Sequence, residues 1–279
     1  MTNTPDAGSP KRSAAPRYGK VDRDYAIRLA TAPADEDAPV YMVNLMKYRE
    51  KADYTDGTEL NISGREADDL YAPVGPLAAI GASMVFLAEV DTQLLGDAPL
   101  WDRIAVVRYP SGRAFIEMQS RTDFKEKHVH KEAGMAETIV MGCTPIDVPK
   151  PTNQPSWADV PHPATEDDGP VVVMHVIKYA EGGLTDHMQA YQNAAGDVAV
   201  PHGVRINGWY QVQGTIMGDG RQWDQVRFNA FPSKAAFMAV AADPTRLAAQ
   251  KEHREPAIAD TYALILRPSI NRLEKSAAW

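Results

Sequence analysis

The sequence predicts an α+β fold in which two tandem ferredoxin-like β-α-β-β-α-β units bring their sheets together into one closed barrel. The main observation is an internal repeat. The segment 101–115 is matched without a gap by 223–237, and both carry Trp-Asp, an aromatic residue, Pro-Ser, Ala and Phe at the same places. Each copy reads as a strand, a turn and a helix that begins at the serine. An internal repeat fixes the architecture, so we expect both halves to fold alike.

Two further pairs of blocks repeat in the same order along the chain. Asn44-Leu45-Met46-Lys47-Tyr48 corresponds to His175-Val176-Ile177-Lys178-Tyr179, and the block 130–138 corresponds to 253–261. In each half, the strands and helices of one complete unit lie between the first of these blocks and the last. The sequence therefore predicts a duplication of the whole unit.

The first half has the element order of a ferredoxin-like unit. Dense apolar runs bounded by turn residues indicate the strands. Pro73 and Pro76 fall inside one helical pattern, so we expect that helix to be kinked or to start late. The expected strands are 39–48, 82–90, 100–109 and 138–144, and the expected helices are 65–80 and 111–127.

The second half repeats this order after a Pro-rich linker. We expect its second helix to begin at Ser233 and to break near Pro244. The other expected elements are strands at 171–179, 204–213, 222–230 and 262–266 and a helix at 184–199. The domain boundaries that follow are a disordered tail and short helix (1–36), the first domain (37–145), the linker (146–169), the second domain (170–270) and a tail (271–279).

Composition narrows the functional classes. The chain has 279 residues and a net charge of -8, whereas nucleic-acid binding requires a basic surface. No apolar run approaches the roughly 20 residues of a membrane span. The single cysteine, Cys143, excludes an internal disulfide and is typical of a reducing compartment, so we expect a cytoplasmic protein. No cluster of cysteine and histidine indicates a metal site.

Several of these motifs resemble a known family. Residues 39–48, with Met42-Val43-Asn44-Leu45 at their centre, are similar to the first strand of the family called domain of unknown function 1330. So are Trp101-Asp102 and the block 109–118. The resemblance covers 37–145 well and 170–268 more loosely, since His175 replaces the strand-one asparagine. It implies a member of the dimeric α+β barrel superfamily, with the dimer formed here within one chain. This superfamily contains monooxygenases, cyclases, isomerases, dehydratases and haem enzymes.

Strand alternation places a polar set of side chains on one face of the second sheet. Arg227 and Asn229 share a face of one strand, and Arg205, Asn207 and Trp209 share a face of the next. We expect this face to point away from the helices. It would then form either a wet seam between the two sheets or a lumen in which arginines bind a polar or anionic molecule. In the first copy, Arg103 and Asn44 are the corresponding candidates for substrate binding.

His175 is the best candidate for acid–base catalysis, because it lies in mid-strand and its ordinary pKa is near neutrality. The alternative is a structural histidine. Olivetolic-acid-cyclase-like members of the superfamily carry a functional histidine on the first strand, although earlier along it. His130 and His253 are expected at helix ends on the surface. His128-x-His130 is a weak metal signal and Cys143 a weak nucleophile candidate.

The function expected from these residues is a cofactor-independent enzyme that acts on a small polar or anionic molecule by proton transfer, as a lyase, isomerase or cyclase. His175 would be the base, and Arg227 with Arg205 would stabilise the developing charge. One alternative is a monooxygenase or haem enzyme of the same superfamily, and another is a non-catalytic binding module. We expect a monomer with an internal pseudo-dimer or a homodimer, and the sequence leaves open whether the pocket lies between the sheets or between sheet and helices.

Overall fold

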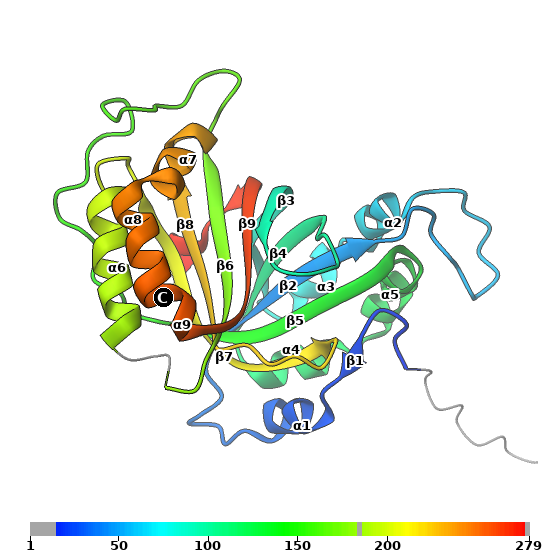
Figure 1. Ribbon diagram of the computed structural model, residues 1–279. Helices are drawn as coiled ribbons and strands as arrows, with labels where there is room; N and C mark the ends of the chain where they lie inside the picture. Colours follow the sequence, from blue (N-terminus) through cyan, green and yellow to red (C-terminus); the bar gives the residue numbers. More distant parts are fainter. Residues whose placement is uncertain (1–14, 183–185, 277–279) are drawn as a thin grey trace, which may run out of the picture.

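The computed structural model describes residues 15–182 and 186–276. The first repeat has the expected order of elements (Figure 1). It comprises β2 (Val40–Tyr48), α2 (Gly64–Tyr71), α3 (Val74–Ala79), β3 (Ser83–Leu95), β4 (Arg103–Tyr109), α4 (Gly112–Met118), α5 (Thr122–Gly134) and β5 (Met135–Pro145).

The second repeat follows the same order with a more broken second helix. It comprises β6 (Val171–Tyr179), α6 (Asp186–Ala199), β7 (Arg205–Gly218), β8 (Gln225–Phe231), α7 (Lys234–Ala242), α8 (Pro244–Ala249), a π-helical turn η1 (Gln250–Arg254), α9 (Glu255–Ala257) and β9 (Ile258–Asn271). Outside the repeats lie β1 (Lys20–Val21), α1 (Arg23–Thr31) and α10 (Leu273–Ser276).

The strands form one closed barrel. Within the first repeat the order is β5-β2-β4-β3, and within the second it is β9-β6-β8-β7, all antiparallel. Strand β3 of one repeat pairs with β9 of the other, and β5 pairs with β7. These two junctions close the eight strands on themselves and leave neither sheet with a free edge. The predicted fold class, two ferredoxin-like units forming an intramolecular α+β barrel, is confirmed.

The inside of the barrel is a packed apolar core. Both repeats contribute large side chains that are almost fully buried, and aromatic rings from the two sheets meet there, with the Phe86 and Phe228 centroids 5.1 Å apart. Such packing leaves no lumen for a polar ligand. The core includes Tyr41, Leu45, Ile104, Met141, Met174, Tyr210, Trp223 and Leu264.

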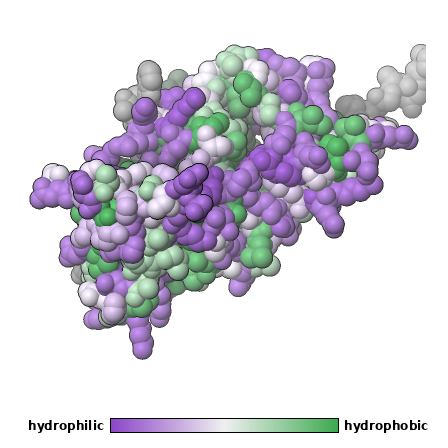
Figure 2. All heavy atoms as spheres, turned by 90° about the horizontal axis from the view of Figure 1, so that it is seen from above, coloured by the Kyte–Doolittle hydropathy of each residue, from purple (hydrophilic) through white to green (hydrophobic). Residues whose placement is uncertain are grey.

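The helices cover the outside of the barrel. Helices α6, α7 and α8 lie along the outer face of the second repeat's strands, and the helices of the first repeat lie against the other sheet (Figure 1). Seen from above, hydrophilic side chains cover most of the surface, and hydrophobic ones form smaller patches (Figure 2). Each sheet therefore has one face in the barrel core and one face towards its own helices.

The Trp-Asp pair that begins the repeat fixes neighbouring strands in both halves. Asp102 accepts hydrogen bonds from Lys47 Nζ at 2.9 Å and from the backbone N–H of Tyr48 at 2.7 Å. Asp224 does the same with Lys178 at 3.0 Å and with the N–H of Tyr179 at 2.7 Å. The identical geometry explains why both copies keep this aspartate, and it indicates a structural role.

The helix starts and breaks follow the sequence. Ser111 Oγ accepts from the N–H of Ala114, and Ser233 Oγ accepts from that of Ala236, so both serines are N-caps. The first helical segment stops at Tyr71 and resumes as α3 after Pro73. The second break falls at Pro244, whose missing N–H suits the first position of α8.

Helices α2 and α5 approach each other at two glycines. A Cβ on Gly64 would lie 2.3 Å from the carbonyl oxygen of Gly134 and 2.6 Å from that of Arg49. A Cβ on Gly134 would lie 2.5 Å from the carbonyl oxygen of Gly64. Only glycine permits this approach, because the obstacles are backbone atoms. The contact brings the ends of both helices against the sheet of the first repeat.

The segment before the first repeat is more ordered than the sequence indicates. Tyr18 is buried, its carbonyl accepts from the N–H of Thr138, and Val21 pairs with Met217 of β7. The expected disorder of residues 1–14 lies outside the described residues. Within the part of the chain that the structure describes, no helix is both long and apolar enough to cross a membrane.

Candidate functional site

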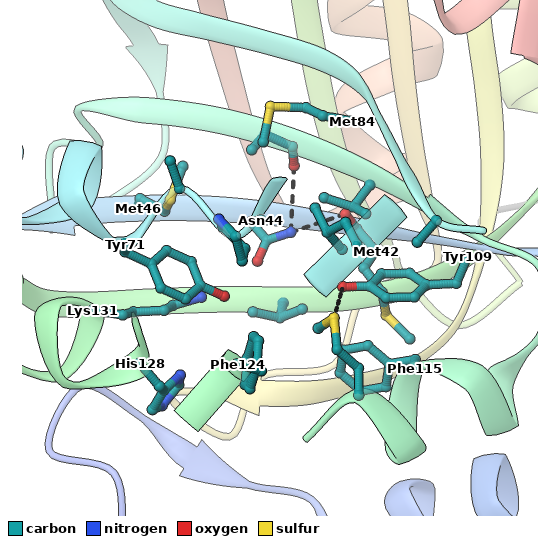
Figure 3. Close-up of a pocket in the computed structure, with 18 of the residues that line it drawn as sticks. Met42, Asn44, Met46, Tyr71, Met84, Tyr109, Phe115, Phe124, His128 and Lys131 are labelled. Carbon is teal, nitrogen blue, oxygen red and sulfur yellow. Dashed lines mark hydrogen bonds between the residues drawn. The ribbon is translucent and has the colours of Figure 1, made fainter. Parts of the chain in front are cut away.

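A cavity of about 750 Å³ lies between the sheet of the first repeat and its helices. Its walls come from β2, β3 and β4 on one side and from α2, α3, α4 and α5 on the other, with the segment around Tyr18 closing one end (Figure 3). Most of the lining is apolar, which suits the carbon skeleton of a small organic molecule. The apolar lining includes Met42, Met46, Met84, Leu77, Tyr109, Phe115 and Phe124.

Asn44 presents an amide in the middle of this apolar wall. Its Nδ2 donates to the carbonyl of Met42 at 2.9 Å, and to that of Ala105 at 3.5 Å. These bonds fix the orientation of the amide and leave Oδ1 facing the cavity (Figure 3). Asn44 therefore presents a fixed hydrogen-bond acceptor to the cavity. Its expected role in binding substrate stays a prediction, and it lies on the helix-covered face of the sheet and not on the face between the sheets.

Lys131 is the second polar group of the cavity, and it lies at the end of α5. Its side chain is 9 % exposed, and Nζ lies 5.3 Å from the centre of the Tyr71 ring. Among the described residues, no carboxylate lies close enough to form an ion pair with Nζ. Burial lowers the pKa of Lys131, while the charge of Asp68 raises it in part. A desolvated amine loses its proton more readily than an exposed lysine, and in its neutral form it can accept a proton from a ligand.

Tyr71 and His128 stand beside Lys131 at the same end of the cavity (Figure 3). Burial raises the pKa of Tyr71 well above its ordinary value, so its hydroxyl stays a hydrogen-bond donor. His128 Nε2 lies 3.0 Å from the hydroxyl of Tyr18. Burial, and then the charge of Lys131, lower the pKa of His128 to about 4, so this imidazole is neutral at physiological pH.

Arg103 lies at the edge of the cavity but is committed to carboxylates. Its Nη1 is 3.0 Å from Asp68 and 3.2 Å from Asp69, and its Nε is 2.9 Å from Glu89. Asp68 Oδ2 also accepts the hydroxyl of Tyr48 at 2.6 Å. These ion pairs neutralise the charge of Arg103, so the guanidinium is not free to bind a substrate as expected. It instead holds Asp68 near Lys131.

The polar face of the second repeat points the opposite way from the prediction. Arg227, Trp209 and Asn229 face the helices of their own repeat, while their neighbours Val226 and Phe228 fill the barrel core. The expected seam or lumen between the sheets is therefore wrong. Alternation identifies which residues share a face, but it does not identify which face the helices cover.

Arg205 and Asn207 do not share the face of Trp209, because a β-bulge interrupts β7. The register with β8 shifts between Ile206 and Gly208, which reverses the alternation beyond it. Arg205 donates to the carbonyls of Val204 and of Pro155 in the linker. Asn207 donates to Asn271 Oδ1 at 2.7 Å. The expected pairing of Arg205 with Arg227 as a clamp is wrong.

His175 lies next to Arg227 on the helix-facing side of β6. Burial, and then the charges of Arg254, Arg227 and Arg246, lower the pKa of His175 to about 3. A base this weak is a poor proton acceptor at neutral pH. The proposal of His175 as the catalytic base has no support in this environment, and the histidine is better described as a neutral member of a cationic cluster.

Neutral His175 should make stability depend on pH. In the unfolded chain it takes up a proton near pH 6.5, whereas in the folded chain its pKa is about 3. Its contribution is therefore complete above pH 6.5 and is lost as the pH falls towards 3. Urea denaturation at about pH 7 and at about pH 5 should show a smaller loss for His175→Asn than for the unmodified chain. Equal losses would show that the folded environment does not disfavour the imidazolium.

The remaining sequence candidates lie away from the cavity or inside the core. His130 Nδ1 is 2.7 Å from the hydroxyl of Tyr54, and His253 lies beside His187. Burial raises the pKa of the Cys143 thiol, which lies in the barrel core. Among the described residues, no group of three or more His, Cys, Asp or Glu side chains is placed to hold a metal ion.

Two residues of the cavity, Lys131 and Tyr71, were not proposed from the sequence, and His128 was considered there only as a weak metal ligand. The residue after His130 is a cation in both repeats, Lys131 in one and Arg254 in the other. The shared cation indicated that both residues take the same place in their repeats, between the sheet and the second helix. The sequence alone indicates a surface helix end, whereas the fold buries Lys131 beside the rings of Tyr71 in α2 and of Tyr18.

The known proteins that resemble this chain do so at low similarity. No family model and no curated protein sequence matches the chain. A protein of unknown function from Rhodopseudomonas palustris is 24% identical over 45% of this chain and 94% of its own, with a TM-score of 0.40. An anthrone oxidase-like protein is 13% identical over 84% of this chain and 92% of its own, with a TM-score of 0.48. A mutant chlorite dismutase from Candidatus Nitrospira defluvii is 14% identical over 85% and 95%, with a TM-score of 0.44.

The chain has the fold of the dimeric α+β barrel proteins, built here within one polypeptide. The finer resemblance to the domain of unknown function 1330 family stays a prediction, as no family model matches. Similarities this distant concern the fold and carry no activity to this chain.

Proposed function

We propose that the protein is a cofactor-independent enzyme that moves a proton on a small, largely apolar organic molecule bound in the cavity of the first repeat. The observation that carries this proposal is Lys131, a buried amine without a carboxylate ion pair among the described residues, in the wall of a cavity of about 750 Å³. The proposal keeps the proton-transfer chemistry expected from the sequence. It moves the site to the other repeat and replaces the polar substrate by an apolar one.

The residues suggest how the reaction would proceed. Neutral Lys131 takes a proton from an acidic C–H or O–H group of the substrate and becomes an ammonium ion. The electron pair left behind is delocalised onto a neighbouring carbonyl oxygen, and the new ammonium and the hydroxyl of Tyr71 stabilise that oxyanion. Asn44 Oδ1 orients the substrate by accepting a hydrogen bond from a hydroxyl group. Returning the proton to another atom completes an isomerisation, and loss of a leaving group completes an elimination.

A cofactor-free monooxygenase is the second candidate, and the apolar lining favours it. Deprotonation of an electron-rich aromatic substrate is the first step of that reaction too, and the resulting anion then reacts with dioxygen. The apolar, sulfur-rich wall formed by Met42, Met46 and Met84 suits both a planar aromatic molecule and dioxygen. The same residues therefore serve either outcome, and the fate of oxygen separates them.

Haem does not fit this cavity. His128 is the histidine of the lining, but Nε2 is engaged by the hydroxyl of Tyr18, and Nδ1 is sealed from solvent without a partner. Neither nitrogen is presented to an iron atom in the cavity.

Deuterium exchange tests the proposal directly. Aryl ketones such as 1-tetralone exchange their α-hydrogens slowly without a catalyst, and NMR in D2O measures the exchange. Lys131→Met keeps the side-chain volume and should slow enzyme-dependent exchange by about a hundredfold or more. Lys125→Met, on the exposed side of the same helix, is the control and should leave the rate unchanged. Equal rates in both variants would rule out Lys131 as the base, and oxygen consumption in step with substrate loss would favour the monooxygenase.

A further inference from the structure

Three arginines gather between the sheet and the helices of the second repeat, at the place that corresponds to the first repeat's cavity. Arg246 Nη2 lies 3.2 Å from the hydroxyl of Tyr191, and the Cζ atoms of Arg246 and Arg254 are each 6.0 Å from the centre of the Tyr191 ring. Arg227 Cζ lies 4.0 Å from the centre of the Trp209 ring. Arg246 and Arg254 thus share the Tyr191 ring, and burial lowers the pKa of Arg254, with the charges of Arg246 and Arg227 lowering it further.

These cations are matched by neutral groups. Arg227 is 5 % exposed and donates to Gln225 Oε1 and to the hydroxyl of Tyr179. Arg254 is 6 % exposed, and its Nη2 donates to Thr261 Oγ1 at 3.5 Å. Among the described residues, none of the three arginines forms an ion pair. Buried charges are normally paired, because leaving them unpaired is costly.

The two repeats differ in how they balance the charges of this layer. Ala105 of the first repeat corresponds to Arg227, and Lys131 corresponds to Arg254. In the first repeat, Arg103 is surrounded by three carboxylates, whereas the corresponding residue of the second repeat is the neutral Gln225. The cations of the second repeat therefore lack the acidic partners that Arg103 has in the first.

The side chains beside the cluster are not sealed from solvent. His175, Trp209 and Asn229 lie in the middle of their strands and face the helices, yet each is only partly buried. Arg254 ends the π-helical turn η1, a local departure from the α-helix that is frequent at functional sites. The arginines thus lie beside partly exposed side chains, where an anion from solvent could reach them.

We propose that the second repeat holds a binding site for the oxyanion group of a small molecule, a carboxylate or a phosphate. Arg227 and Arg254 would donate from the sheet and from the η1 turn, and Arg246 would donate from α8. Guanidinium groups bind such oxyanions through paired hydrogen bonds. The site is separate from the cavity of Lys131. It is lined by cations, whereas that cavity is lined mostly by apolar side chains.

Calorimetry with defined anions tests this site. Inorganic phosphate, pyrophosphate and succinate are titrated into the full chain at low salt, and we expect saturable binding of at least one. Arg254→Gln and Arg227→Gln should each weaken that binding by roughly tenfold to a hundredfold. Arg246 is more exposed than the other two arginines, so Arg246→Gln should fold normally. A loss of anion binding in this variant would show that the loss in the other two is not merely a folding defect. Tighter binding of phosphate than of succinate would indicate a ligand with a phosphate group, and the reverse order would indicate a carboxylate.

Two controls keep the outcomes distinct. Arg205→Gln alters an arginine of the same sheet whose guanidinium donates to backbone carbonyls, and it should bind the anion normally. Lys131→Met should also bind normally, because the proposed reaction and the anion site are in different repeats. Absence of saturable binding in the unmodified chain would overturn the proposal. The proposal would also be overturned if all three arginine variants bound the anion as tightly as the unmodified chain.

Discussion

Replacing Gly64 by alanine should destabilise the protein by about 3 kcal/mol or more, one of the largest effects expected of any single methyl group in this chain. The added Cβ would lie 2.3 Å from the carbonyl oxygen of Gly134 and 2.8 Å from the backbone nitrogen of Arg49. Neither obstacle is the end of a flexible side chain, so helix α2 must move away from α5. The N–H of Gly64 also donates to the carbonyl of Arg49 at 3.1 Å, and that bond would be strained.

The measurement is urea denaturation with Gly75→Ala as the control. Gly75 lies in α3, and a Cβ there would meet nothing within 4 Å, so alanine should be neutral or slightly stabilising. Because α2 carries Tyr71 and α5 carries Lys131, Gly64→Ala should also reduce deuterium exchange in the molecules that still fold. A stability equal to that of Gly75→Ala would contradict the close approach of the two helices.

The fold was predictable because duplication and alternation are both visible in a sequence. The Trp-Asp pair, the Pro-Ser turn and the strand-one block recur in the same order, and each recurrence has a physical reason in the structure. Asp102 and Asp224 hold adjacent strands, and Ser111 and Ser233 cap helices. A unit with helices on one face of its sheet must cover the other face, which led directly to the closed barrel.

The candidate site was harder to predict, because it depends on contacts between elements. Alternation showed which residues share a face with Asn44, but it did not show that the helices cover this face, so its place in the cavity was not predicted. The bulge in β7 separated Arg205 from Arg227, and Gly208, which lies at the bulge, was the local signal that the alternation is interrupted there. Lys131 reads as a surface residue until Gly64 and Gly134 bring α2 over it. Periodicity describes one element at a time, whereas burial of a lysine is decided by the neighbour that covers it.

Asp68→Asn should have two effects, on stability and on the pH dependence of exchange. Burial raises the pKa of Asp68, but Arg103 and Tyr48 both donate to Oδ2 and so keep it an anionic acceptor. Removing that charge leaves Arg103 with Glu89 and the exposed Asp69 as its remaining ion pairs. Breaking one partner of a buried ion pair costs about 3 kcal/mol, which denaturation would measure.

The effect on pH dependence follows from the charge of Asp68 beside Lys131. The carboxylate raises the pKa of Lys131, and the base must be neutral to accept a proton, so exchange increases as the pH rises through that pKa. Without the carboxylate the pKa falls, and the midpoint of the pH–rate profile should move to lower pH by about one unit. Asp69→Asn, at an exposed neighbouring carboxylate, should move it much less. A merely structural Asp68 would lower the amount of folded enzyme and leave the midpoint where it was, so a fixed midpoint would contradict Lys131 as the base.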